Sequence, residues 1–135
     1  MVRSTRRAHL AYVSLACLAL VLAFVVHEVC AVDLEPQALL GEWQGTWSMA
    51  SSRGSTGNYY ITINKVEGNK VYGRSERPAT SKSGESNWNF VGTLAENVVT
   101  VKTADLAMEL TVNGKNMTGW SLIRGNRFDL SLAKK

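Results

Sequence analysis

The stretch Leu106-Ala-Met-Glu-Leu-Thr-Val-Asn-Gly-Lys-Asn-Met-Thr-Gly-Trp-Ser-Leu-Ile123 decides the fold class. Apolar and polar residues alternate on both sides of Asn113-Gly114-Lys115, and this period of two is typical of a β-strand with one buried face. An Asn-Gly pair between two such runs is the strongest short-range signal for a β-hairpin. We therefore predict strands over residues 106–112 and 116–123, joined by a tight turn.

The same period of two continues through the rest of the chain from residue 41 onward. It predicts six further strands, over residues 41–49, 58–66, 70–76, 87–94, 98–103 and 127–133. Strands that follow one another through short turns, each with one apolar face, need either a second sheet or closure on themselves. Eight strands are enough for a closed barrel that holds side chains or one small ligand. We predict an all-β fold, an eight-stranded antiparallel up-and-down barrel over residues 41–135, with a β-sandwich as the alternative.

The first 31 residues have the layout of a secretion signal. An apolar run over residues 10–26 follows three arginines, and the small residues of Val29-Cys30-Ala31 come just before an expected cleavage point. We predict a signal peptide over residues 1–31 and a mature chain that begins at Val32, with residues 32–40 as a short lead. The expected location is therefore the periplasm or the outside of a bacterial cell. An uncleaved N-terminal transmembrane anchor is the alternative, because the run is at the low end of the length that spans a bilayer.

The charge of the chain gives little support for a nucleic-acid partner. The formal net charge is +4 over 135 residues, but from Val32 onward 12 Lys and Arg residues accompany 10 Asp and Glu residues, which leaves only +2. Binding to phosphates needs a clustered cationic face, and these charges are interleaved. We expect no nucleic-acid partner, and a membrane contact only if the signal segment is uncleaved.

Cysteine and histidine occur only near the N-terminus, at His9, Cys17, His27 and Cys30. The predicted barrel therefore has no residues of its own for a disulfide, a Cys/His zinc site, a cysteine nucleophile or a Ser-His relay. The strand pattern also does not bring any two carboxylates into positions where they could act on one substrate. We expect a protein that is not an enzyme, with no metal site and no cofactor.

The lengths of the connections indicate which end of the barrel is open. In an up-and-down barrel the connections after the second, fourth and sixth strands share one end, and here all three are tight turns. The opposite end has two long polar connections, over residues 50–57 and 77–85. Binding residues usually lie on long loops that a rigid frame supports, so we predict that this end is the open one.

The residues expected to point inward near that end are the candidate ligand-binding residues. They are Trp47, Tyr59, Ser75, Trp88 and Ser121. Aromatic walls with a few hydroxyl groups are typical of a small-ligand cavity. We predict a non-catalytic extracytoplasmic binding module for a small apolar or amphipathic ligand. The alternative is a structural or protein-interaction domain of the cell envelope, in which the tryptophan rings fill the barrel.

Leu40-Gly41-Glu42-Trp43 resembles the opening of the first strand in the calycin group, which includes the lipocalins and avidins. The resemblance extends from Gly41 to the C-terminus in strand count and is specific at Gly41 and Trp43. It implies a barrel in which Trp43 packs across the closed end, often under a basic residue of the last strand. Arg127 is expected at the other end and does not suit this role. The polar biotin contacts of avidins have no counterparts here, so biotin binding is not expected.

Overall fold

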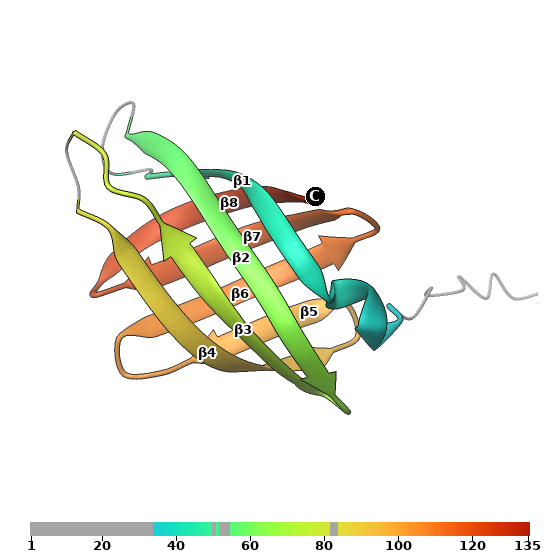
Figure 1. Ribbon diagram of the computed structural model, residues 1–135. Helices are drawn as coiled ribbons and strands as arrows, with labels where there is room; N and C mark the ends of the chain where they lie inside the picture. The colour runs from blue at the N-terminus through green and yellow to red at the C-terminus, as the bar shows by residue number, and fades with distance from the viewer. Residues whose placement is uncertain (1–33, 50, 52–54, 82–83) are drawn as a thin grey trace, which may run out of the picture. The chain divides into compact units, whose positions relative to one another are not determined.

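Eight antiparallel strands close into one barrel in the computed structural model of the protein, which describes residues 34–49, 51, 55–81 and 84–135 (Figure 1). Each strand pairs with the next along the chain, and the last pairs with the first. The strands are β1 (Gly41–Ser48), β2 (Thr56–Glu67), β3 (Lys70–Arg77), β4 (Ser86–Ala95), β5 (Val98–Lys102), β6 (Leu106–Asn113), β7 (Asn116–Ile123) and β8 (Asn126–Lys134). This confirms the predicted antiparallel up-and-down barrel and excludes the sandwich.

The predicted strand limits lie within two residues of those observed. One difference concerns the turn after β6. Asn113 belongs to β6 and pairs with Asn116, so the turn consists of Gly114 and Lys115. Gly114 has a φ of 58°, a conformation that glycine adopts without the steric cost of a side chain.

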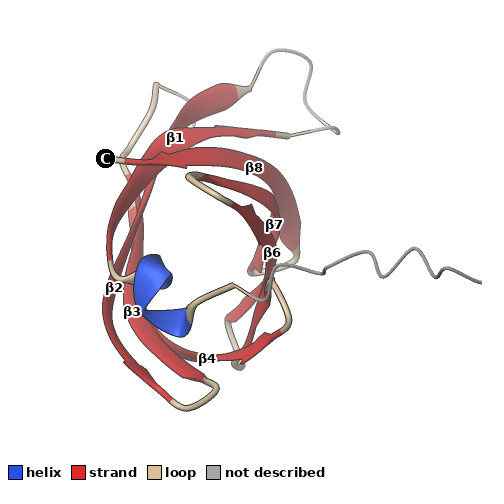
Figure 2. Ribbon diagram, turned by 90° about the vertical axis from the view of Figure 1, so that its right-hand side faces the viewer, coloured by secondary structure: helices blue, strands red, loops and turns tan. Residues whose placement is uncertain are grey.

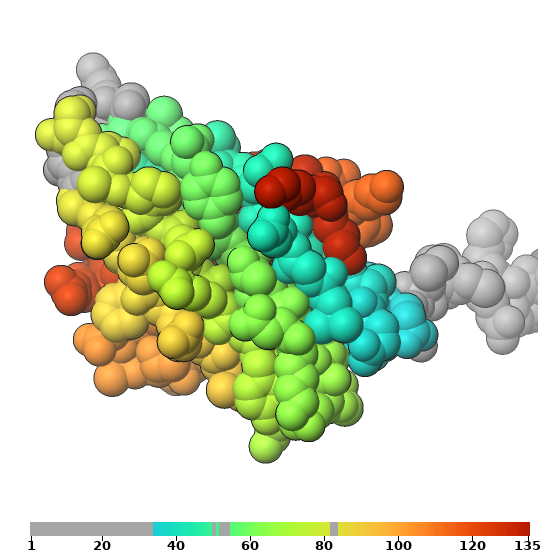
Figure 3. All heavy atoms as spheres, in the orientation of Figure 1, coloured from blue at the N-terminus to red at the C-terminus, as the bar shows by residue number. Residues whose placement is uncertain are grey.

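One end of the barrel, here called the closed end, is covered by a short 3-10 helix, η1 (Pro36–Leu39) (Figure 2). The indole Nε1 of Trp43 donates a hydrogen bond of 2.9 Å to the carbonyl of Leu39. Lys134 of β8 donates from Nζ to the carbonyl of Ala38, and this nitrogen lies 5.6 Å from the centre of the Trp43 ring. The first and last parts of the described chain therefore meet at this end, where cyan and red spheres adjoin in Figure 3.

A basic residue of the last strand thus covers Trp43, as the resemblance implies. This residue is Lys134. Arg127 lies over the ring of Trp120 instead, with its guanidinium carbon 5.2 Å from the ring centre. This contact agrees with the expected position of Arg127, at the end of β8 away from Trp43. The arrangement around Trp43 is compatible with a calycin-like barrel.

Apolar side chains fill the half of the barrel next to η1. Alternate residues of every strand point inward, as the period of two predicts. Those near the closed end include Trp43, Ile63, Val71, Leu94, Val112, Met117 and Leu132. In β2 the register shifts between Ile63 and Lys65, a β-bulge that lets both Ile63 and Val66 point inward. The sequence pattern did not predict this bulge.

The predicted signal peptide and the first part of the lead, residues 1–33, lie outside the described residues. Within the part of the chain that the structure describes, no helix is long and apolar enough to cross a membrane.

Candidate functional site

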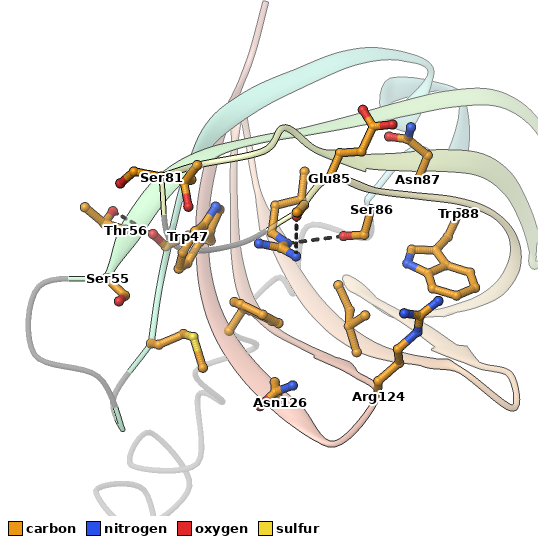
Figure 4. Close-up of a pocket in the computed structure, with 16 residues that line it drawn as sticks. Trp47, Ser55, Thr56, Ser81, Glu85, Ser86, Asn87, Trp88, Arg124 and Asn126 are labelled. Carbon is orange, nitrogen blue, oxygen red and sulfur yellow. Dashed lines mark hydrogen bonds between the residues drawn. The ribbon is translucent and has the colours of Figure 1, made fainter.

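A pocket of about 670 Å³ lies at the end of the barrel opposite η1, here called the open end. It is bordered by the β1–β2 and β3–β4 connections, the two long polar connections of the sequence (Figure 4). Residues 50, 52–54, 82 and 83 of these connections lie outside the described residues. The pocket is therefore at the end that the connection lengths predicted to be open.

Two of the five candidate residues, Trp47 and Trp88, line this pocket. Trp47 is buried, Trp88 is half-buried, and Figure 4 shows them on different sides of the pocket. The position of the Trp47 ring depends on two neighbours, the small residue Gly57 and the aromatic residue Phe128. A Cβ atom at Gly57 would lie 2.7 Å from its Nε1, and the Phe128 ring meets it edge to face at 5.2 Å between centres.

The other three candidates, Tyr59, Ser75 and Ser121, are buried one layer deeper in the barrel. Ser75 pairs across the strands with Trp88, and Ser121 pairs with Phe128, so each lies beside a residue of the pocket lining. We call these three residues the hydroxyl cluster. The five candidates thus form a pocket wall and a polar layer behind it.

All five candidates have a buried polar atom without a hydrogen-bond partner among the described residues. These atoms are Trp47 Nε1, Tyr59 Oη, Ser75 Oγ, Trp88 Nε1 and Ser121 Oγ. A buried polar group that is not hydrogen-bonded typically costs about 1–3 kcal/mol. These groups show that this half of the barrel is not built as a plain apolar core, and the three hydroxyl groups lie close enough to one another for Ser75 and Ser121 to act on Tyr59.

Burial raises the pKa of Tyr59 above its usual value of about 10. The nearby hydroxyl groups of Ser75 and Ser121 and the positive charge of Arg77 oppose this shift, but burial is the larger effect. Tyr59 is therefore a neutral hydroxyl group at physiological pH, able both to donate and to accept a hydrogen bond.

Arg77 is a site residue that the sequence analysis missed. It was assigned to the polar connection over residues 77–85, but it is the last residue of β3 and its side chain is only 6% exposed. Val71, Gly73 and Ser75 are the inward residues of β3, and Arg77 continues their period of two. Extending that alternation by one step would have found it.

The guanidinium group of Arg77 packs against two aromatic rings in the pocket wall, which also contact each other. Its central carbon is 4.9 Å from the ring centre of Phe128 and 5.4 Å from that of Trp47. It donates hydrogen bonds to Ser86 Oγ at 3.2 Å and to the Gly84 carbonyl at 3.0 Å, which are dashed in Figure 4. Burial lowers the pKa of Arg77, which still remains a cation because an arginine starts so far above neutral pH.

A second arginine stands at the edge of the pocket. Arg124, in the turn between β7 and β8, has its guanidinium carbon 5.8 Å from the ring centre of Trp88. Glu85 is the carboxylate among the described lining residues. Two positive charges and one negative charge make this lining electropositive. The pocket thus offers aromatic faces, a buried cation and hydrogen-bond donors.

No group of three or more His, Cys, Asp or Glu side chains that could hold a metal ion occurs among the residues that the structure describes. In comparisons with known proteins, the chain matches no protein-family model, no curated protein and no solved structure.

Proposed function

We propose that the protein is a non-catalytic binding module that holds a small amphipathic ligand in the open end of a calycin-like barrel. The observation that carries this proposal is a pocket of about 670 Å³ at the open end, lined by Trp47 and Trp88, whose buried indole Nε1 atoms have no hydrogen-bond partner among the described residues. Small-molecule sites are typically concave, with aromatic walls and a few convergent polar groups. The pocket combines these features.

The calycin-like assignment is supported by the closed end. There Trp43 hydrogen-bonds to η1 and lies beneath Lys134 of the last strand. The proposed location outside the cytoplasm is supported by the signal-like sequence over residues 1–31. The barrel would then act in the periplasm or outside the cell.

A structural or protein-interaction domain is the second candidate, because the half of the barrel near η1 is filled. Its apolar residues form one continuous cluster that reaches Trp47 and Phe128. In this case the pocket would be only an indentation above a core. The two candidates differ in whether a small molecule stays with the purified protein.

Native mass spectrometry of protein exported by a bacterial host and purified without denaturant tests the proposal. We expect a small molecule to accompany the wild-type barrel and to be depleted in Trp88→Ala, because removing an anchoring ring typically weakens binding by about 2 kcal/mol or more. Trp120→Ala is the matched control, since this partly buried tryptophan is on the outer face. A bare polypeptide in every sample would favour the interaction domain, and equal occupancy in wild type and Trp88→Ala would show that Trp88 does not anchor the ligand.

A further inference from the structure

Strand β4 is longer than its neighbour β5, so half of one side of β4 has no strand beside it. β4 has ten residues and β5 has five. On the side of β3, pairing extends from Ser86 to Thr93, but on the side of β5 it stops at Gly92, which pairs with Val101. Among the residues that the structure describes, no strand is paired with residues 86–91 on this second side.

The backbone groups of Asn87, Asn89 and Val91 point toward this unpaired side. The N–H of Leu94 donates to the carbonyl of Asn69, in the turn before β3. Alternate residues of a strand direct their backbone groups to opposite sides, so the even-numbered residues of β4 bond toward β3 and the odd-numbered ones face the other way. We call residues 87–91 on this side the free edge. Its N–H and C=O groups can bond to another strand.

Hollows border the free edge along its whole length. Asn87 and Trp88 line the pocket at the open end, and residues 89–91 line a second hollow of about 520 Å³ that extends to Thr103. Val91 is 53% exposed, the highest value for a large apolar side chain in the described part of the chain. Residues 86–91 also contain no charged residue and no proline, which commonly protect a free edge from pairing.

A second copy of the free edge is a suitable partner, because two identical antiparallel segments related by a twofold axis are self-complementary. In the register that puts Trp88 opposite Trp88, Asn87 of each copy faces Asn89 of the other, and both direct their backbone groups at the partner. The two Trp88 side chains meet in a non-hydrogen-bonded pair, where side chains are closest and aromatic pairs are favourable. A twofold axis through Asn89 would instead extend the second copy to Gly92, which already pairs with Val101.

The charges beside the free edge are complementary in the same register. Residue 85 of the second copy then faces Val91, next to Lys102, the last residue of β5. Lys102 is exposed and follows the inward Val101, and Glu85 is exposed and continues the outward series of β4. Both side chains are therefore on the outer face. The carboxylate of each copy comes close to the ammonium group of the other, and the symmetry makes this contact twice.

We propose that two copies of this chain associate through the free edges of β4 and form one sheet across the dimer. The backbone groups of Asn87 and Asn89 in each copy bond to those of the other, and Trp88 pairs with its counterpart at the twofold axis. Glu85 of each copy pairs with Lys102 of the other. This interface goes beyond the proposed function, because its formation does not depend on a molecule in the open end.

Sedimentation equilibrium of the exported protein, from micromolar to millimolar concentration, tests the dimer. We expect wild type to dimerise reversibly and Asn89→Pro to weaken the dimer at least tenfold, because proline removes an N–H of the free edge but no hydrogen bond to β3. Asn89→Thr keeps the N–H and is the matched control, which should dimerise like wild type. A wild-type chain that stays monomeric throughout, or a dimer that a folded Asn89→Pro variant retains in full, would overturn the proposal.

Charge reversal tests the register and does not depend on the proline variant. Glu85→Lys and Lys102→Glu each place like charges together across the interface, so each should weaken the dimer several-fold. The double variant restores opposite charges and should recover most of the wild-type affinity. Added salt should reduce these differences, because the ion pairs are exposed. Single variants that dimerise like wild type, or a double variant weaker than either single one, would overturn this arrangement of the two edges.

Discussion

The guanidinium carbon of Arg77 lies 5.4 Å from the centre of the Trp47 ring, so a buried cation and an aromatic wall of the open end form one contact. Arg77 also hydrogen-bonds to Ser86 and to the Gly84 carbonyl, which connects the end of β3 to the first residue of β4 and to the segment before it. The same side chain therefore shapes the pocket and supplies its charge. The faces of the two rings attract the guanidinium cation, and this attraction stabilises the charge where it is buried away from bulk solvent.

Gly57 should be intolerant of a side chain because it makes room for Trp47. A Cβ atom there would approach Trp47 Nε1 to 2.7 Å, too close unless the ring moves. We expect Gly57→Ala to lower the free energy of unfolding by about 1–3 kcal/mol and to shift tryptophan emission. Gly84→Ala is the control, because a Cβ atom at Gly84 meets nothing within 4 Å. Urea unfolding that shows equal stability for both variants would contradict this account of the pocket wall.

Tyr59 should make the barrel sensitive to alkaline pH. Because burial raises the pKa of Tyr59 in the folded state, its contribution to stability is complete below the unfolded pKa of about 10 and is lost as the pH rises through the folded value. We expect Tyr59→Phe to flatten the fall in unfolding free energy above about pH 10. Parallel curves for wild type and Tyr59→Phe would show that this hydroxyl does not remain neutral in the fold.

Lys134 should stabilise the closed end through its contacts with Ala38 and Trp43. Lys134→Met keeps an unbranched chain but removes the hydrogen bond and the cation over the ring, so we expect a loss of about 1 kcal/mol. Lys135→Met is the matched control, since Lys135 forms an exposed ion pair with Glu42. Thermal unfolding measures the stability of both variants relative to wild type. A larger effect at Lys135 than at Lys134 would contradict the role given to Lys134.

Processing of the N-terminus gives a prediction that is independent of the barrel. If residues 1–31 are a cleaved signal peptide, the intact mass of the exported protein should correspond to a chain that begins at Val32. A mass that retains those residues would indicate an uncleaved anchor.

The barrel could be predicted from the sequence because its evidence is local. The period of two fixes which residues of a strand point inward, and tight turns such as Gly114-Lys115 set the pairing of neighbours. The same periodicity identified Trp47, Ser75 and Ser121 as inward residues near the open end. These inferences need only a few consecutive residues.

The sequence did not reveal two kinds of contact. One kind joins residues that are distant in the sequence, and the other buries a residue whose polar neighbours indicate a loop. Lys134 reaches Ala38 across 96 residues, and only closure of the barrel brings them together. Arg77 continues the inward alternation of β3, but an arginine next to Pro78 and a polar run looks like the start of a loop. Tertiary packing at the open end, where the guanidinium contacts the rings of Trp47 and Phe128, overrides that local preference.

The most direct test of the central claim, that a small amphipathic ligand occupies the open end, is quenching of tryptophan emission by a brominated ten-carbon amphiphile. Bromine quenches only rings close to it, so the measurement reports where the chain binds. The account predicts saturable quenching that is strongly reduced in Trp88→Phe and unchanged in Trp120→Phe. Quenching that does not saturate, or that disappears in Trp120→Phe and persists in Trp88→Phe, would contradict it.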